Sequence, residues 1–152
     1  MINARADTVA EKPSFRAAFK QRRCLVIADA YDEWKRVGKE KIPYMMTIRD
    51  ESPFAFAGIW ERWTDTTGES IESCSTITTE PNALTAMIHD RMPVIIPKKS
   101  YDIWLDPSMQ DTGKLQGLLR SYPPEEMNVA EVSKIINNAR NEVDPRLLDA
   151  PE

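Results

Sequence analysis

Between residues 24 and 79 the chain places four runs of apolar and β-branched residues one after another, with only turn-like segments between them. The runs are CLVIADAY (24–31), YMMTIRD (44–50), FAFAGIWERW (54–63) and SIESCSTITT (70–79). Runs of this kind are typical of β-strands. Because strands and helices do not alternate, a doubly wound parallel sheet is disfavoured. The pattern predicts an α+β fold with a strongly curved, barrel-like mixed β-sheet and short peripheral helices.

Short helices are predicted before and after these strands. The first begins at Pro13 and Ser14, where a proline in the first turn loses no hydrogen bond, and puts Phe15, Ala18 and Phe19 on one face. Further short helices are expected within residues 80–90, 98–107 and 111–124, and further strands at 93–97 and 126–133. Residues 32–43 are interpreted as a turn around Gly38, and the polar tail from residue 137 as mostly irregular.

Length and composition set the class of protein. A chain of 152 residues with 41% hydrophobic and 29% charged residues is expected to form one domain, residues 1–152, with a real core. It has neither a run of about 18 apolar residues nor an N-terminal signal peptide, so we expect no membrane span. Two cysteines do not suggest a disulfide scaffold, which favours a reducing cytoplasm. The net charge of −4 argues against a general nucleic-acid coat but allows a local basic cleft.

The chain has a single histidine, His89, which lies just before the apolar run MPVIIP (92–97). Histidine titrates near neutral pH and suits proton transfer, but a lone histidine is often an ordinary hydrogen-bonded residue. No metal site is expected, because there is no second histidine and Cys24 and Cys74 are far apart in sequence.

Three other stretches offer candidate chemistry. In NAR (3–5), Asn3 and Arg5 alternate, so in an extended segment they point to one side. In YDEW (31–34), Glu33 adjoins Trp34, and burial against an aromatic would suit it for acid–base work; a solvated turn residue is the simpler interpretation.

TTEPN (78–82) supplies hydroxyls, including that of Thr79, and a possible phosphate-binding helix start, or only a capping turn. Arg91 could bind phosphate or simply pair with a carboxylate such as Asp90.

Taken together, four stretches closely resemble the SRAP family, the SOS response-associated peptidases. They are INARADTVAEKPSFRAAFKQRRCLVIADAYDEW (2–34), PFAFAGIWERW (53–63), STITTEPNALTAMIHDRMPVIIP (75–97) and YDIWLDP (101–107). The resemblance covers nearly the whole chain and keeps the family's order of motifs.

The resemblance implies a protein that binds single-stranded DNA and crosslinks covalently to abasic sites through a thiazolidine. It implies that Asn3 orients the nucleophilic cysteine, that Glu33 shuttles protons, and that His89 assists Schiff-base chemistry and its reversal. It assigns DNA contacts to Arg5, Trp34, Thr79 and Arg91, with Arg16, Lys20 and Arg23 as possible extensions of a basic face. It implies no metal or other cofactor, and we expect a monomer in the cytoplasm that joins the nucleoid on DNA damage.

The chain departs from the family at its start. Family members begin with Met-Cys-Gly-Arg, and the segment with the nucleophilic cysteine has no counterpart before NAR. The expectation is an N-terminally truncated SRAP-like domain with impaired crosslinking, since Cys24 and Cys74 carry no free α-amino group. A non-catalytic single-stranded DNA-binding module and an inactive remnant or partner-dependent subunit are the alternatives, and peptidase activity on other proteins stays open.

Overall fold

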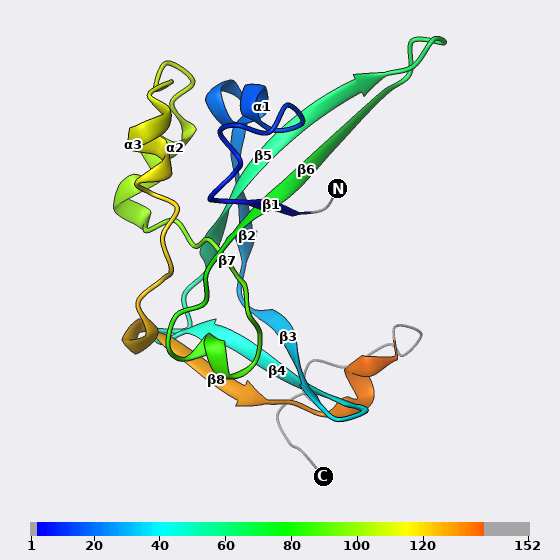
Figure 1. Ribbon diagram of the computed structural model, residues 1–152, viewed down its shortest axis with the longest axis vertical. Helices are drawn as coiled ribbons and strands as arrows, with labels where there is room; N and C mark the ends of the chain where they lie inside the picture. The colour runs from blue at the N-terminus through cyan, green and yellow to red at the C-terminus, as the bar shows by residue number, and fades with distance from the viewer. Residues whose placement is uncertain (1–2, 139–152) are drawn as a thin grey trace.

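The computed structural model describes residues 3–138, which form two β-sheets with short helices at the periphery (Figure 1). The larger sheet has the strand order β1-β6-β5-β2, and β7 pairs with the C-terminal end of β6. Its β1–β6 pair is parallel and its other pairs are antiparallel, so the sheet is mixed. The five strands are β1 (Asn3–Arg5), β2 (Arg23–Ala28), β5 (Phe54–Thr64), β6 (Ser70–Thr79) and β7 (Met92–Pro93).

The second sheet is antiparallel, with the order β3-β4-β8, and lies at the lower end of Figure 1. It consists of β3 (Tyr31–Val37), β4 (Glu40–Ile48) and β8 (Met127–Glu131). The chain enters it directly from the larger sheet, because only residues 29 and 30 separate β2 from β3. The turn between β3 and β4 contains Gly38 with a φ of 61°, a backbone conformation that glycine adopts without strain.

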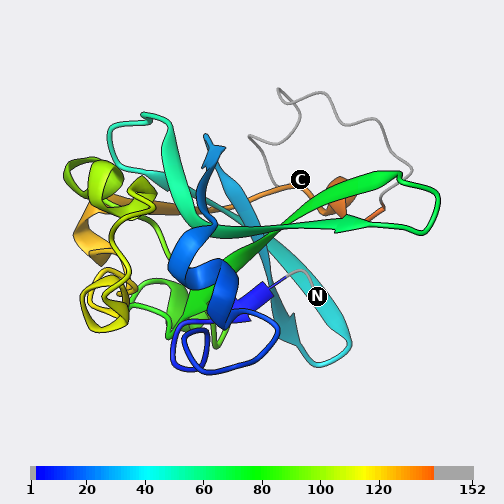
Figure 2. The same ribbon diagram turned by 90° about the horizontal axis from the view of Figure 1, so that it is seen from above.

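The helices are short. They are the α-helices α1 (Arg16–Gln21), α2 (Tyr101–Leu105) and α3 (Thr112–Gln116), and the 3-10 helices η1 (Thr85–Met87), η2 (Lys98–Ser100), η3 (Pro124–Glu126) and η4 (Lys134–Asn137). Helices α1 and α2 contact the larger sheet, whereas η3 and η4 adjoin the smaller one (Figure 1, Figure 2). None of the helices in the described part of the chain is long and apolar enough to cross a membrane.

The two faces of the larger sheet have different roles. One face carries Ala4, Ala57 and Ile77, which are fully buried with Phe19 and Trp104 in a core beneath the helices. The other face follows from the register. Asn3 lies opposite Thr76, Thr76 opposite Gly58, and Gly58 opposite Cys24. Since paired residues in neighbouring strands point to the same side, these four form one row across the sheet.

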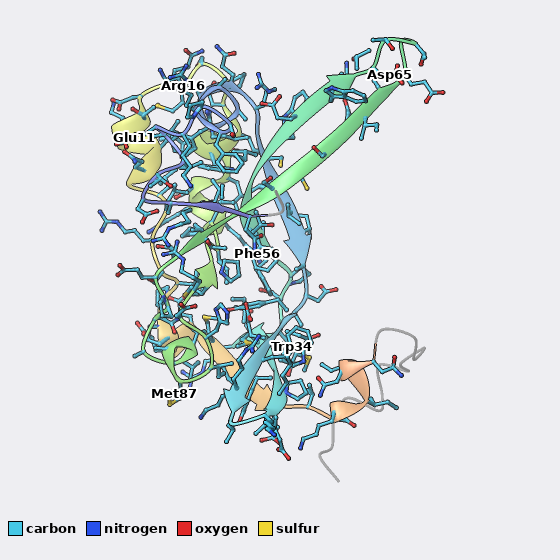
Figure 3. All side chains as sticks on the ribbon, turned by 45° about the vertical axis from the view of Figure 1, so that its right-hand side comes forward. Glu11, Arg16, Trp34, Phe56, Asp65 and Met87 are labelled. Atoms are coloured by element: carbon cyan, nitrogen blue, oxygen red, sulfur yellow. The ribbon has the colours of Figure 1, made fainter. Side chains whose placement is uncertain are left out.

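A second core joins the two sheets. Tyr31 from β3 packs edge-on against Phe56 of β5, with ring centroids 5.6 Å apart, and Phe54 stands 5.3 Å from Phe56. Phe56 lies between the two halves of the molecule in Figure 3. Met46 and Met92 complete this core from β4 and β7, and both are at most 1% exposed. It therefore fixes how the smaller sheet sits against the larger one.

The predicted α+β class and the curved mixed sheet are confirmed, although the strands form two sheets and no closed barrel. The predicted turn over residues 32–43 is wrong, because most of it is the β3–β4 hairpin and only the centre at Gly38 is a turn. The strand expected at 93–97 is reduced to Met92–Pro93 and an isolated bridge between Ile95 and Phe56. The irregular tail predicted beyond residue 138 lies outside the described residues.

The suggestion that Arg23 extends a basic surface is also wrong, because Arg23 is 6% exposed. Its guanidinium donates to the carbonyl oxygens of Trp104 (2.7 Å) and Phe19 (2.9 Å) and to that of Asp106, and it stacks over the Trp104 ring. Arg23 thus ties α1 and α2 to β2, and burial lowers the pKa of its guanidinium.

Candidate functional site

Glu33 and His89 lie close enough to influence one another electrostatically, although they come from different parts of the chain. Burial raises the pKa of the half-buried Glu33 above its ordinary value. The charge of His89 and a hydrogen bond with the backbone of Trp34 partly oppose this shift, while Asp90 adds to it. A carboxyl group with a raised pKa close to an imidazole is suited to general acid–base catalysis.

The His89 ring is placed so that its Nδ1 has a partner in either protonation state. The backbone N–H of Arg91 lies 3.1 Å from Nδ1 and donates to it when Nδ1 carries no proton. The carbonyl oxygen of Arg91 (3.1 Å) and the carboxylate of Asp90 (3.3 Å) can accept from Nδ1 when it carries a proton. The side chain is 43% exposed, so a substrate can reach it.

Asn3 and Arg5 occupy one side of β1, as alternation predicts, with the buried Ala4 between them pointing to the other side. Arg5 forms a two-point contact with Asp7, Nε to Oδ1 at 3.1 Å and Nη2 to Oδ2 at 2.8 Å. Asp90 also stabilises the charged form of Arg5 and so helps to raise its pKa, after the larger contribution from Asp7. β1 therefore faces the segment that carries His89.

Arg91 and Thr79 line a common polar cavity of about 450 Å³ beside this segment. Arg91 Nη2 donates to the carbonyl oxygen of Thr78 over 2.7 Å, while its buried Nε has no hydrogen-bond partner. Asp7, Glu80 and Arg120 also line the cavity. The cavity thus continues from the Arg5–Asp7 pair toward α3 and could receive a polar group.

Trp34 does not share a face with Glu33. Successive residues of a strand point to opposite sides, so Trp34 points to the side of β3 opposite Glu33. Its indole N–H donates to Oδ1 of Asn137 over 2.6 Å. The raised pKa of Glu33 therefore comes from burial between the sheets and not from packing on its neighbouring tryptophan.

Neither cysteine belongs to the Glu33–His89 pair. Cys24 lies in the row of Asn3 but three strands away, roughly 14 Å at the usual strand spacing. Burial raises the pKa of the Cys24 thiol, which makes it a poorer nucleophile. Cys74 is exposed on β6. Within residues 3–138, His, Cys, Asp and Glu side chains form no group of three or more that could hold a metal ion.

Sequence reasoning did not single out Asp7, and it named Asp90 only as a possible ion-pair partner of Arg91. Asp7 follows Arg5 by two residues, and this spacing was the available signal. Asp90 adjoins His89, but that it also acts on Glu33 and Arg5 depends on the approach of β1 and β3, which local sequence does not report.

The fold is mixed α+β, and Glu33, His89, Arg5 and Arg91 lie on segments that interact electrostatically. The protein is therefore of the class of α+β proteins with a polar site between two sheets. Residues 1–139 match the family of SOS response associated peptidases (SRAP). The chain is 42% identical over 151 residues to the abasic site processing protein YoqW of Bacillus subtilis, covering 99% of this chain and 67% of that protein. It is 32% identical to the abasic site processing protein HMCES of Xenopus tropicalis, covering 91% and 47%.

A crystal structure of a Bacteroides thetaiotaomicron protein superimposes with a TM-score of 0.89 at 38% identity, over 99% of this chain and 66% of that one. A second one, from Bordetella bronchiseptica, has a TM-score of 0.76 at 29% identity, over 86% of this chain and 64% of that one. The chain belongs to the SRAP family, and it spans about two thirds of the length of these bacterial relatives.

Proposed function

We propose that this chain binds single-stranded DNA at abasic sites and moves protons at the exposed sugar aldehyde. The observation that carries the proposal is the pairing of Glu33, whose pKa is raised by burial, with the chain's one histidine. The names of the relatives, abasic site processing proteins, support the same substrate. Asn3, Glu33 and His89 are assigned to the chemistry, and Arg5, Trp34, Thr79 and Arg91 to DNA.

Addition of an amine and a thiol to an aldehyde needs a proton at several steps. In the thiazolidine crosslink that the family resemblance implies, the amine and the thiol are those of an N-terminal cysteine, and the carboxyl group of Glu33 in its protonated form delivers a proton to the oxygen that leaves as water. His89 accepts a proton from the attacking amine through Nε2 in the tautomer whose Nδ1–H donates to the carbonyl oxygen of Arg91. Reversal runs through the same groups with the roles exchanged. Asn3, on the face of β1 that continues toward this pair, orients the nucleophile.

The arginines are assigned to the phosphates on either side of the abasic nucleotide. Arg91 borders the polar cavity together with Thr79, whose hydroxyl can donate to a phosphate oxygen. Arg5 is exposed and already presents its guanidinium fork to a carboxylate, so a phosphate can replace Asp7. Trp34 offers a face on which a base can stack, which contributes about 1–3 kcal/mol per base.

Fluorescence anisotropy with three labelled oligonucleotides tests the proposal: a single strand with an abasic analogue, the intact single strand and the blunt duplex. We expect the abasic single strand to bind most tightly. Replacing Arg5 and Arg91 together with alanine should weaken binding and reduce the slope of log affinity against log salt by about 1.4, because each single-strand phosphate contact contributes about 0.7.

Arg36→Ala is the matched control, because Arg36 is exposed on β3 away from the polar cavity. Equal affinity for all three oligonucleotides, or a double variant that binds as the control does, would contradict the proposal.

A non-catalytic single-stranded DNA-binding module is the second candidate. It is favoured by the position of Arg91 and Thr79 on a cavity to which neither cysteine contributes. Glu33→Gln separates the two functions. It leaves the arginines in place, so a binding module keeps its full preference for abasic strands, whereas proton transfer at the aldehyde is lost.

A further inference from the structure

Asn82 lies at the centre of a hydrogen-bond network inside the loop that carries His89. The side chain is 7% exposed. Its Oδ1 accepts from the backbone N–H groups of Leu84 (3.0 Å) and Thr85 (2.9 Å) and from the Thr85 hydroxyl (3.2 Å). Its Nδ2 donates to the carbonyl oxygen of Tyr122 over 2.7 Å. The amide oxygen of Asn82 therefore accepts hydrogen bonds inside the loop, and its amide nitrogen donates to a segment forty residues away.

The two ends of the loop are held together by strand pairing. Residues 80–91 leave β6 after Thr79 and return at Met92, and Thr79 and Met92 are paired in the sheet. Beside this pair, the Ser121 hydroxyl donates to the carbonyl oxygen of Glu80 over 2.8 Å. The segment at residues 121–122 thus holds the loop at Glu80 and at Asn82, while η1 and His89 lie in the part of the loop beyond these contacts.

The network reaches the histidine through the main chain. Asn82 Oδ1 holds the N–H and the hydroxyl of Thr85, and the carbonyl oxygen of Thr85 accepts from the backbone N–H of His89 over 3.0 Å. On the other side of the ring, the backbone of Arg91 holds Nδ1, through its N–H or its carbonyl oxygen. The backbone of His89 is held from the Asn82 side and its ring from the Arg91 side, which together determine where Nε2 points.

We propose that Asn82 is a positioning residue, which sets the orientation of His89 by bridging η1 to the Tyr122 segment. This inference rests on the proposed function for its chemical consequence. A general acid or base works only within hydrogen-bond reach of the proton it moves, and a displacement of about 1 Å can cost a rate factor of about 100. Asn82 itself lies inside the loop and contacts neither Glu33 nor the His89 ring.

The single histidine makes the orientation directly measurable. In nitrogen-15 labelled protein, one set of imidazole signals reports the tautomer and the titration of His89 in the absence of DNA. We expect the wild-type ring signals to differ from those of a freely exposed histidine, because the backbone of Arg91 holds Nδ1 and Thr85 holds the backbone of His89. In Asn82→Ala the signals should move toward those of a freely exposed histidine, and in Asn82→Ser they should lie between, because serine keeps an acceptor but cannot also reach Tyr122.

Asn128→Ala is the matched control, because Asn128 is an exposed asparagine on β8. It should leave the ring signals unchanged. Circular dichroism confirms that each variant is folded. Wild-type ring signals in folded Asn82→Ala, or in folded Asn82→Ser if the alanine variant does not fold, would overturn the proposal. So would loss of folding in both, because Asn82 would then support the whole fold and not His89.

The DNA readout comes last and is independent. For folded Asn82 variants we expect the affinity for an abasic oligonucleotide to change less than about 3-fold and the dependence of that affinity on pH to shift, because the position of the His89 ring changes. If wild-type protein shows no preference for abasic strands, the proposed function fails while the ring signals still decide the role of Asn82. Shifted ring signals with an unchanged dependence of affinity on pH would overturn the functional part of the inference.

Discussion

Gly58 lies in the middle of β5, directly opposite Cys24, and has no room for a side chain. A methyl group added there would stand 2.7 Å from the Cys24 sulfur, 3.2 Å from Cγ2 of Val26 and 3.3 Å from the Cys24 carbonyl oxygen. The first distance is far inside van der Waals contact, and the other two are tight. Gly58→Ala must therefore push the Cys24 side chain or the strand aside.

The cost follows from two opposing effects. Overpacking a well-filled interior typically costs about 1–3 kcal/mol. Replacing glycine by alanine also reduces the conformational freedom of the unfolded chain, which returns about 0.4–1 kcal/mol where the backbone conformation is compatible. We expect a net loss of about 1–2 kcal/mol in the free energy of unfolding. For a chain of this size that corresponds to a fall in Tm of about 2–8 °C.

A double-mutant cycle assigns the cost to the sulfur. Cys24→Ala removes the atom in the closest contact, so Gly58→Ala should cost less than about 0.5 kcal/mol in that background. Cys74→Ala is the matched control. Cys74 lies on β6, is opposite Trp60 and does not contact Gly58, so it should give no rescue. Urea unfolding of the variants measures each term. Additive costs in the Cys24→Ala background, or a neutral Gly58→Ala, would refute the packing argument.

Three further predictions follow from single groups. Burial raises the pKa of Glu33, so its ionisation destabilises the fold as pH rises from the unfolded-state pKa through the folded-state pKa. Glu33→Gln should therefore gain up to about 1 kcal/mol over wild type at about pH 8 and nothing at about pH 4, since the group is half-exposed; an equal gain at both pH values in thermal unfolding would contradict this. Arg23→Met leaves buried carbonyl oxygens without donors and should cost about 3–5 kcal/mol in urea unfolding, against less than about 0.5 kcal/mol for the exposed Arg16→Met. Neither Cys24 nor Cys74 should form a heat-stable adduct with an abasic oligonucleotide on a denaturing gel, because both are internal residues without an α-amino group; an adduct abolished by replacing either cysteine would show the opposite.

The strands with apolar runs were predictable because their side chains are buried on one or both faces. β5 is the clearest case, with six consecutive buried residues from Phe54 to Ile59. The β3–β4 hairpin was missed because it lacks such a continuous buried run. Its middle carries exposed residues such as Arg36 and Lys39, since the smaller sheet has one face in solvent, and a charged stretch around Gly38 looks like a loop. An exposed strand differs from a loop in its pairing with a neighbouring strand, and this pairing depends on the partner strand and not on the charged stretch itself.

In the candidate site, too, some features follow from local sequence rules and others depend on the tertiary structure. That Asn3 and Arg5 share a side follows from alternation in an extended segment, and β1 has this form. That Trp34 turns away from Glu33 follows from the same rule, once residues 31–37 are known to be a strand. The proximity of Glu33 to His89 follows from no local rule, because it requires β2 to pass from one sheet into the other and the loop after β6 to fold back beside it.

The dependence of the site on both sheets gives the apolar core around Phe56 a functional consequence. Glu33 is carried by the smaller sheet, Asn3 and Arg5 by the larger one, and His89 by a loop whose return strand begins with the buried Met92. The core that contains Phe56 and Met92 fixes the positions of the two sheets and of the His89 loop relative to one another. A substitution there that leaves the chain folded but shifts one sheet relative to the other would separate the carboxyl group from the imidazole without touching either. The burial that raises the pKa of Glu33 comes from the same packing, so position and proton affinity change together.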